Sequence, residues 1–348
     1  MRWDNLTAPP VEGDPERAAP ATPPLPLALP GAVVRTFDTP EFAGMTFYEV
    51  QAKSILNRVP GQSRVPFEWT VNPYRGCSHA CVYCFARNTH TYLDLDAGAD
   101  FDRKVIVKVN AGELVRRELA APRWRGAHVA MGTNVDCYQR AEGRYRLMPQ
   151  IIAALRDFAN PFSILTKGTL ILRDLPLLRE AAEVTRVGIS YSVGFVDEQL
   201  WRAVEPGTPH PRRRLAAVRA LTDAGFSVGV LMAPILPGLS DSDESIDATV
   251  SAIAAAGATS VTPLALHLRP GAREWYAHWL ARDYPHLVPR YRELYRAGAY
   301  APQAYQRELT ARVRIAARRH GLHRAEQGDN RSLPEPPAPP AAEQLTLL

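Results

Sequence analysis

The chain has 348 residues, of which 46% are hydrophobic and 22% charged, an ordinary composition for a globular protein that can bury a substantial core. No apolar run is long enough to span a membrane, and the first residues lack the basic start and apolar stretch of a secretion signal. We therefore predict a cytoplasmic protein with no membrane attachment. The net charge of +5 mildly favours a polyanionic partner, although the predominance of Arg over Lys is equally explained by genome base composition.

Residues 1–34 include the run TPPLPLALP and show no apolar periodicity, so we predict a disordered, Pro-rich leader. A core with an N-terminal extension is expected over residues 35–271. Residues 272–325 predict a helical cap on this core, and residues 326–348 predict a Pro-rich tail.

Six short β-like segments alternate with helix-like stretches in the core. The strands are expected at Phe67–Asn72, His128–Thr133, Phe162–Lys167, Thr185–Val193, Ser227–Ile235 and Ser260–Leu268. The helices are expected at Met148–Phe158, Asp174–Val184, Arg212–Ala224 and Glu244–Ala256. Such alternation predicts parallel strands joined by right-handed crossovers, and six units suit an incomplete barrel better than a closed eightfold one. Val105–Val109 predicts a further strand, added to the main sheet.

Three of the four cysteines lie in the stretch NPYRGCSHACVYCFAR, just after the first predicted strand. Cys77, Cys81 and Cys84 have the spacing Cys-x3-Cys-x2-Cys, and clustered cysteines of this kind indicate metal ligands rather than disulfides. Three thiolates can each bind one corner of a cubane iron–sulfur cluster, whereas four are needed to ligate every iron. The missing ligand leaves one iron open, as a catalytic metal site requires.

Other residues of this stretch bear on what the cysteines hold. Tyr83 can place an aromatic surface beside the open iron, and Arg75 and Arg87 supply positive charge that favours thiolates. The alternative is a zinc site with His79 or His90 as the fourth ligand. Zinc ligands usually come in two separated pairs, so the spacing favours the cluster.

The pattern Cys-x3-Cys-x-aromatic-Cys resembles the signature of the radical S-adenosylmethionine (SAM) superfamily. The surrounding residues look like its spore photoproduct lyase-like branch, which is also described as DNA repair photolyase-related. Further matching stretches are GTNVDCYQ at Gly132–Gln139, LTKGTLILRDLPLL at Leu165–Leu178, Glu205-Pro206 with Arg214 beyond it, and APILPGLSD at Ala233–Asp241. Together the matches span about Thr46 to Gly321.

This resemblance implies an α/β fold, a partial (β/α)6 TIM-like barrel with its chemistry at the carboxyl ends of the strands. It implies a [4Fe–4S] cluster on Cys77, Cys81 and Cys84 that binds SAM at the open iron. One electron, from a donor such as flavodoxin or ferredoxin, then cleaves SAM to methionine and a 5′-deoxyadenosyl radical.

Candidate SAM contacts lie beside the cluster and at or near strand ends, as in the family. They are Tyr83, Thr133, Asn134, Asp136, Lys167, Ser190, Arg214 and Pro234. The guanidinium of Arg214 suits the methionine carboxylate, and the turn that Pro234 opens resembles the family's adenine-contacting turn. Taken alone, each of these residues also suits a loop or a barrel lining.

Cys137, the fourth cysteine, stands where related sequences commonly have proline. As a fourth cluster ligand it would block SAM, so we disfavour that role. A hydrogen-atom donor or radical relay is chemically credible because the S–H bond is weak. The competing interpretation is a small buried apolar side chain. The resemblance alone therefore does not imply thymine-dimer lyase activity.

The predicted cap is rich in arginines and aromatic residues. The arginines are Arg312, Arg314, Arg318, Arg319 and Arg324, and the aromatic residues include Trp275, Trp279, Tyr284, Tyr291 and Tyr295. Such a combination suits contact with a nucleic-acid backbone and base stacking. Equally, the aromatic rings could pack on the barrel while the arginines face water.

The last five residues resemble the pentapeptide by which bacterial repair proteins bind the replication sliding clamp. Gln344 would fill a polar subpocket, and Leu345, Leu347 and Leu348 an apolar one, on a tail that raises the effective concentration at DNA. The terminal Leu replaces the usual Phe, and chance in a Leu-rich chain explains the match equally well.

Three functions remain open at the level of sequence. The leading hypothesis is a radical SAM enzyme, of a lyase-like kind, that acts on nucleic acid in DNA repair. A second keeps the radical chemistry but directs it at a peptide or small molecule. A third is a non-catalytic iron–sulfur protein tethered to the sliding clamp.

Overall fold

The main sheet runs through most of the chain. The computed structural model describes residues 31–61 and 65–322, in which seven strands form this sheet in the order β11-β10-β9-β8-β7-β4-β3. The strands are β3 (Leu56–Arg58), β4 (Trp69–Val71), β7 (Val129–Met131), β8 (Phe162–Thr166), β9 (Val187–Ser192), β10 (Val228–Ile235) and β11 (Ser260–Ala265). Only β3 is antiparallel to its neighbour, and the six parallel strands are the six predicted from the sequence.

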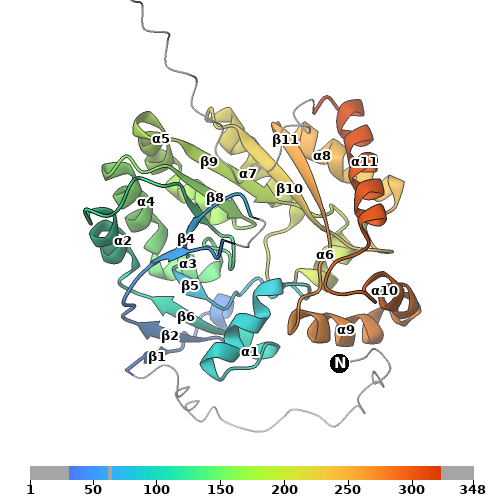
Figure 1. The fold of residues 1–348 in the computed structure, drawn as a ribbon, viewed down its shortest axis with the longest axis horizontal. Coiled ribbons are helices and arrows are strands. Elements are labelled where there is room, and N and C mark those ends of the chain that lie inside the picture. Colours follow the sequence, from blue (N-terminus) through green and yellow to red (C-terminus); the bar gives the residue numbers. More distant parts are fainter. Residues whose placement is uncertain (1–30, 62–64, 323–348) are drawn as a thin grey trace, which may run out of the picture.

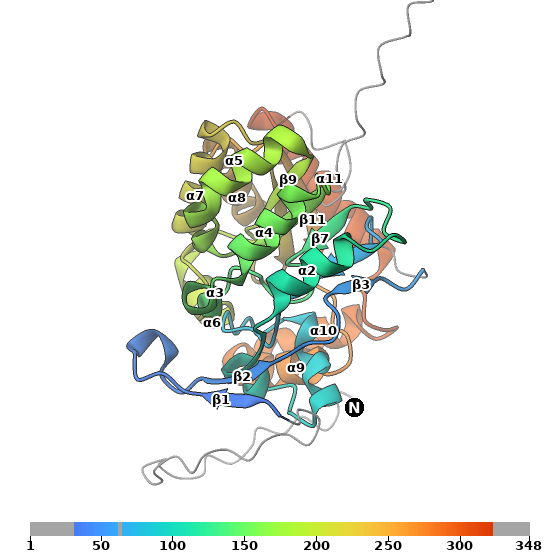
Figure 2. The same cartoon turned by 90° about the vertical axis from the view of Figure 1, so that its left-hand side faces the viewer.

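Helices connect the parallel strands and cover the outer face of the sheet (Figures 1 and 2). They are α2 (Ala111–Leu119), α4 (Leu147–Asp157), α5 (Leu175–Val184), α7 (Pro211–Asp223), α8 (Asp243–Ala255) and α11 (Gln303–Arg319). Short helices α3 (Arg140–Tyr145) and α6 (Glu198–Val204) follow β7 and β9. The strand order of the described residues ends at β11 and β3, so the sheet stays open. The predicted partial (β/α)6 barrel is confirmed.

The two faces of this sheet carry different side chains. Residues opposite each other in a parallel register point to the same side. One face carries Val, Ile, Met and Phe, which share a single apolar core with the covering helices. Except for Leu165, the inner face carries small side chains in two rows, Thr70, Ala130, Ser163 and Gly188 in one and Leu165, Ser190, Gly229 and Ser260 in the next. These fill less of the barrel interior than the bulky branched residues of a closed barrel.

A second sheet lies below the barrel in Figures 1 and 2. Its order is β1-β2-β6-β5, formed by β1 (Val33–Arg35), β2 (Thr46–Val50), β6 (Lys104–Lys108) and β5 (Tyr74–Arg75). The prediction that Val105–Val109 adds to the main sheet is therefore wrong. β6 pairs with β2 and β5 instead, which buries Val105, Ile106 and Val107.

The predicted leader ends earlier than residue 34, because Val33 and Val34 pair with β2 as part of β1. The segment after β11 divides into two parts. Helices α9 (Ala272–Asp283) and α10 (Val288–Leu294) pack their aromatic rings with residues of the cysteine loop. Helix α11 instead packs against α8 and β11, as the sixth helix of the barrel.

This division separates the arginines and aromatic residues of the C-terminal segment. Tyr291 and Tyr295 are fully buried, whereas Arg312 and Arg319 of α11 form ion pairs with acidic residues of α8. The described residues thus fit the structural interpretation of this segment. Arg324, residues 1–30 and the pentapeptide Gln344–Leu348 lie outside the described residues. Among the helices that are described, none combines the length and apolarity needed to cross a membrane.

Candidate active site

The three clustered cysteines occupy a loop between β5 and β6, whose two ends are therefore fixed by the second sheet. The amide of Cys77 donates to the carbonyl of Phe101 at 2.9 Å. Before it, Gly76 has φ +81°, and a Cβ there would lie 2.6 Å from the carbonyl oxygen of Lys104. Only glycine satisfies both conditions. Cys77 and Cys81 are buried, and Cys84 is partly buried.

Segments that follow two strands of the main sheet, β7 and β9, hold the back of the cysteine loop. After β7, Gln139 accepts from the amide of Ser78 and donates to the carbonyl of Gly76, both at 2.9 Å. After β9, the amide of Gly207 donates to the carbonyl of His79 at 3.1 Å. A Cβ on Gly207 would lie 2.0 Å from the carbonyl oxygen of Ser78. The cysteine loop is thus fixed at the carboxyl end of the barrel.

A buried guanidinium closes the front of the loop. Arg87 is fully buried and donates to the carbonyl of Cys81 at 2.9 Å and to Asp102 at 2.8 and 3.0 Å. Its Cζ atom lies 5.2 Å from the ring centre of Phe101 and 4.7 Å from that of Trp275 in α9. Arg87 therefore joins the cysteine loop to the helix that covers it.

Burial sets the protonation of the free thiols. It raises the pKa of Cys81 to about 12, even though the charge of Lys167 acts in the opposite direction. Burial also raises the pKa of Cys77 and Cys84, and Arg87 opposes the shift at Cys84. Thiolate ligation must therefore displace protons, which couples metal binding to pH.

Each histidine of this region uses one ring nitrogen for a contact within the protein. His90 Nε2 lies 2.9 Å from the carbonyl oxygen of Lys104, and His79 Nδ1 lies 3.4 Å from Asp136 Oδ2. In the described part of the chain, no three His, Cys, Asp or Glu side chains converge as a single metal ion requires. A cubane does not need such convergence, because its thiolates bind different irons. Three thiols on one loop match the donor set that a cubane with one open iron requires.

Asp136 is the hub of the predicted SAM-binding residues. It accepts hydrogen bonds from Thr166 Oγ1 and the amide of Lys167, both at 2.6 Å, and from the amide of Tyr138 at 2.8 Å. Through His79 it also reaches the cysteine loop. Asp136 thus ties the ends of β7 and β8 to the loop.

The other predicted residues lie around this hub. Thr133 and Asn134 are half-buried in the turn after β7, and Pro234 is half-buried near the end of β10, after a cis peptide bond. Lys167 Nζ donates to Ser192 Oγ at 2.9 Å and lies 5.8 Å from the ring centre of Tyr83. Ser190 is buried on the inner face of β9.

Arg214 lies in a different environment from the one predicted. Its guanidinium is fully buried, forms an ion pair with Glu205, and donates to Thr208 Oγ1 at 3.0 Å and to the carbonyls of Ser192 and Pro209. These contacts favour a positioning role over direct binding of a methionine carboxylate. Glu205 in turn accepts a hydrogen bond from the hydroxyl of Tyr83.

Glu205 and Asn72 are functional candidates that the sequence analysis did not assign. Glu205 stood in a matching stretch, but its pairing with Tyr83 and Arg214 depends on tertiary structure. Asn72 follows β4, and its side-chain oxygen is buried without a hydrogen-bond partner among the described residues. Such an atom is suited to a polar ligand, and the residue lies in the motif that carries the cysteines.

Cys137 is buried in the apolar core, with 1% of its surface exposed. Burial raises the pKa of its thiol well above the usual value, and the carboxylates of Asp136 and Glu142 add to this shift. The side chain therefore remains an S–H group at neutral pH. A hydrogen-atom donor requires that state, which the buried thiol of Cys77 shares in the metal-free chain.

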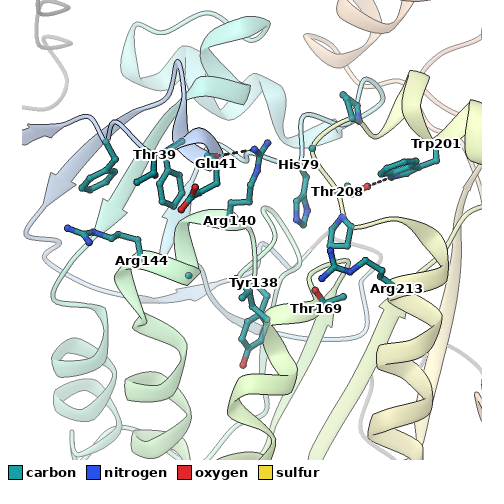
Figure 3. Close-up of a pocket in the computed structure, with 17 residues that line it drawn as sticks. Thr39, Glu41, His79, Tyr138, Arg140, Arg144, Thr169, Trp201, Thr208 and Arg213 are labelled. Carbon is teal, nitrogen blue, oxygen red and sulfur yellow. Dashed lines mark hydrogen bonds between the residues drawn. The ribbon is translucent and has the colours of Figure 1, made fainter.

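A pocket of about 720 Å³ opens on the outer side of the cysteine loop (Figure 3). Its lining includes His79 of the loop, Tyr138 and Arg140 after β7, and Arg213 of α7. Thr39, Glu41 and their neighbours in the N-terminal extension form the facing wall. Sequence reasoning missed this pocket, because its walls come from segments far apart in the chain.

An open α/β barrel with a three-cysteine loop at the carboxyl ends of its strands defines the class of this protein. Residues 71–249 match the family model of the radical SAM superfamily, and the chain belongs to that superfamily. It is 52% identical to an uncharacterized protein of Mycobacterium bovis, over 91% of this chain and 92% of that protein. An uncharacterized protein of Methanocaldococcus jannaschii is 27% identical, over 56% of this chain and 69% of that protein.

The fold is similar to that of spore photoproduct lyase. A structure of that enzyme complexed with dinucleoside spore photoproduct has a TM-score of 0.59 and 15% identity, over 79% of both chains. A variant with bound AdoMet and dinucleoside spore photoproduct has a TM-score of 0.57 and 14% identity, over 78% of both chains. The predicted relation to the spore photoproduct lyase-like branch is thus confirmed at the level of the fold.

Proposed function

We propose that this protein is a radical SAM enzyme in which Cys77, Cys81 and Cys84 hold a [4Fe–4S] cluster that binds SAM. The observation that carries the proposal is the placement of three thiols on one loop, held by Gln139 and Gly207 at the carboxyl end of an open barrel. Membership of the superfamily and the small side chains inside the barrel support it.

When bound and reduced, the cluster would supply the electron that cleaves SAM to methionine and a 5′-deoxyadenosyl radical. The chain's own residues would bind and orient SAM and exclude water from the site. Asp136 fixes the ends of β7 and β8, and Lys167 and Asn72 offer a donor and an unpartnered acceptor near strand ends. Glu205, paired with Arg214, fixes the hydroxyl of Tyr83 within the cysteine loop. The helix α9 covers this loop.

Anaerobic reconstitution of the full chain tests this proposal. We expect about four irons per chain and formation of 5′-deoxyadenosine after reduction with SAM present. Cys81→Ala should lose both, because two thiolates cannot hold the cubane. An intact, reducible cluster that forms no 5′-deoxyadenosine would overturn the enzymatic proposal and favour the non-catalytic iron–sulfur protein.

We further propose that the substrate is a nucleic acid, with a damaged or modified base as the reacting group. Support comes from the fold shared with spore photoproduct lyase and from the net charge of +5. The yield of 5′-deoxyadenosine should rise when a lesion-bearing oligonucleotide is added. A rise with peptides or small molecules, and none with nucleic acid, would instead favour the second hypothesis.

We propose Cys137 as the hydrogen-atom donor, because it directly follows Asp136, the hub of the predicted SAM-binding residues, and is buried. Cys137→Ala should still cleave SAM but change the distribution of substrate-derived products, whereas Cys137→Ser tests whether a stronger O–H bond can substitute. Unchanged products in both variants would leave Cys137 a core residue.

The pentapeptide Gln344–Leu348 is proposed as a sliding-clamp ligand on the strength of its sequence alone. Removal of these five residues should abolish binding to a purified bacterial clamp and leave the yield of 5′-deoxyadenosine unaltered. Equal clamp binding by the full-length and shortened chains would exclude this partner.

A further inference from the structure

The pocket on the outer side of the cysteine loop has a pattern of charged side chains that the proposed SAM chemistry does not use. Its walls come from α3, from the segment around Gly207, and from residues 37–42 of the N-terminal extension. Its floor includes His79, which stands between the first two clustered cysteines. Any ligand held here would therefore contact the cysteine loop directly.

Positive charge dominates the lining side chains. Arg140, Arg144 and Arg213 contribute three guanidinium groups against the one carboxylate of Glu41. Within the described residues, neither Arg144 nor Arg213 has an ion-pair partner, and both are exposed. The pocket therefore favours a polyanion.

The guanidinium groups are spread along the pocket rather than gathered at one point. Figure 3 shows Arg144 toward one end, Arg213 toward the other, and Arg140 with His79 between them. Arg140 donates to the carbonyls of Glu41 and Ser78, at 3.1 and 3.0 Å, which fixes its position without neutralising its charge. The Cζ atom of Arg144 lies 4.7 Å from the ring centre of Phe37, which orients this guanidinium without neutralising its charge. A row of such cations suits successive phosphates better than a single phosphate group.

The volume of the pocket and its lining side chains indicate which kind of polyanion it can bind. A volume of about 720 Å³ is that of a small-molecule site, which has room for part of one strand but not for the two paired strands of a duplex. The half-buried indole of Trp201 lines the same pocket as Arg213. Cationic side chains combined with an aromatic surface are typical of sites for single-stranded nucleic acid.

We propose that this pocket binds the sugar–phosphate backbone of a single nucleic-acid strand and so holds the substrate against the outer side of the cysteine loop. The inference rests on the proposed nucleic-acid substrate. It specifies in addition where the nucleic acid binds and that it binds as a single strand. Arg144 and Arg213 bind phosphates, and Arg140 joins the strand to the loop through Ser78.

Binding of a short fluorescent oligothymidylate to the full chain, measured over a range of salt concentrations, tests the proposal. Each phosphate contact on a single strand contributes about 0.7 to the slope of log K against log salt. The double variant Arg144→Ala with Arg213→Ala should therefore bind more weakly at low salt, with a slope that is smaller by about 1.4. The matched control is Arg123→Ala with Arg314→Ala, two exposed arginines outside the pocket, which should retain the affinity and slope of the unaltered chain.

Several outcomes would overturn the inference. The first is an equal loss of affinity in the two double variants. The second is a duplex of the same sequence that binds as tightly and depends equally on Arg144 and Arg213. The third is displacement of the strand by polyglutamate at equal charge concentration. Failure of the unaltered chain to bind any strand would reject this surface together with the nucleic-acid substrate. Formation of 5′-deoxyadenosine is measured separately without any oligonucleotide, so failure of the radical chemistry is distinguished from failure of the pocket.

Discussion

At the scale of single residues, the buried pair of Glu205 and Arg214 makes a strong prediction. Both side chains are fully buried, and the carboxylate also accepts from Tyr83. Glu205→Gln keeps the shape but leaves the charge of Arg214 buried and unpaired, so we expect a loss of about 3–5 kcal/mol in the free energy of unfolding. Urea denaturation of the metal-free chain measures this difference in the free energy of unfolding.

Tyr83→Phe is the matched control for this variant, because it removes one hydrogen bond to the same carboxylate and leaves the ion pair. Its expected cost is about 1.5–3 kcal/mol, the contribution of a hydrogen bond to a charged group. If Glu205→Gln cost less than Tyr83→Phe, the ion pair would not be what holds this region together.

His128 gives a prediction on pH. Burial, with the nearby charge of Arg186, lowers its pKa to about 4, and its Nε2 lies 2.9 Å from Ser163 Oγ. The unfolded chain takes up a proton near pH 6.5 that the folded chain binds only near pH 4. Stability is therefore full above pH 6.5 and falls as the pH decreases toward 4. His128→Gln should flatten this fall in denaturation midpoints measured at several pH values, and an unchanged pH dependence would contradict the assignment.

At the scale of elements, close backbone contact between two loops makes Gly207 irreplaceable. A methyl group there would lie 2.0 Å from the carbonyl oxygen of Ser78, so Gly207→Ala must push the cysteine loop away from the segment after β9. We expect a loss of about 1–3 kcal/mol and fewer irons bound per chain after reconstitution. Gly61→Ala, at an exposed glycine with nothing within 4 Å of the added carbon, should retain the iron content of the unaltered chain.

The elements also show how far the sequence alone could predict this molecule. The six parallel strands were predictable because each is a short apolar or β-branched run bounded by turn residues. The cysteine loop was predictable because its three ligands lie within eight residues. The second sheet was not, because β5 has only two residues and β2 pairs with β6 across more than fifty residues.

The same limit applies to the candidate site. Asp136 and Lys167 were found because they follow predicted strands, and the structure brings them within hydrogen-bonding distance. Arg214 was assigned to SAM because a guanidinium suits a carboxylate, whereas the structure pairs it with the carboxylate of Glu205. Nothing local in the sequence indicates that pairing. The charge of the pocket was likewise hidden, since Arg144 and Arg213 are distant in the chain.

For the whole molecule, cluster binding should be linked to global stability. The cysteine loop contacts both sheets and α9, so a ligand that binds only the folded chain stabilises all of them together. We expect the reconstituted protein to have a Tm higher than that of the metal-free protein by roughly 3–6 °C, equivalent to about 2–4 kcal/mol. The Cys81→Ala variant should show no increase after the same treatment. An increase in that variant would mean that iron binds elsewhere.

The helix α9, which covers the cysteine loop, is synthesised long after that loop. Trp275 stacks on Arg87 and Gly271 touches Asn88, yet these covering residues are synthesised nearly two hundred residues after Cys84. At translation speeds of about 5–20 residues per second, that interval lasts roughly 10–40 s. During it, the nascent chain already carries all three thiols without their cover. We therefore expect iron and sulfide to reach these thiols more readily on the ribosome-bound chain than on the folded chain, in which α9 covers the loop.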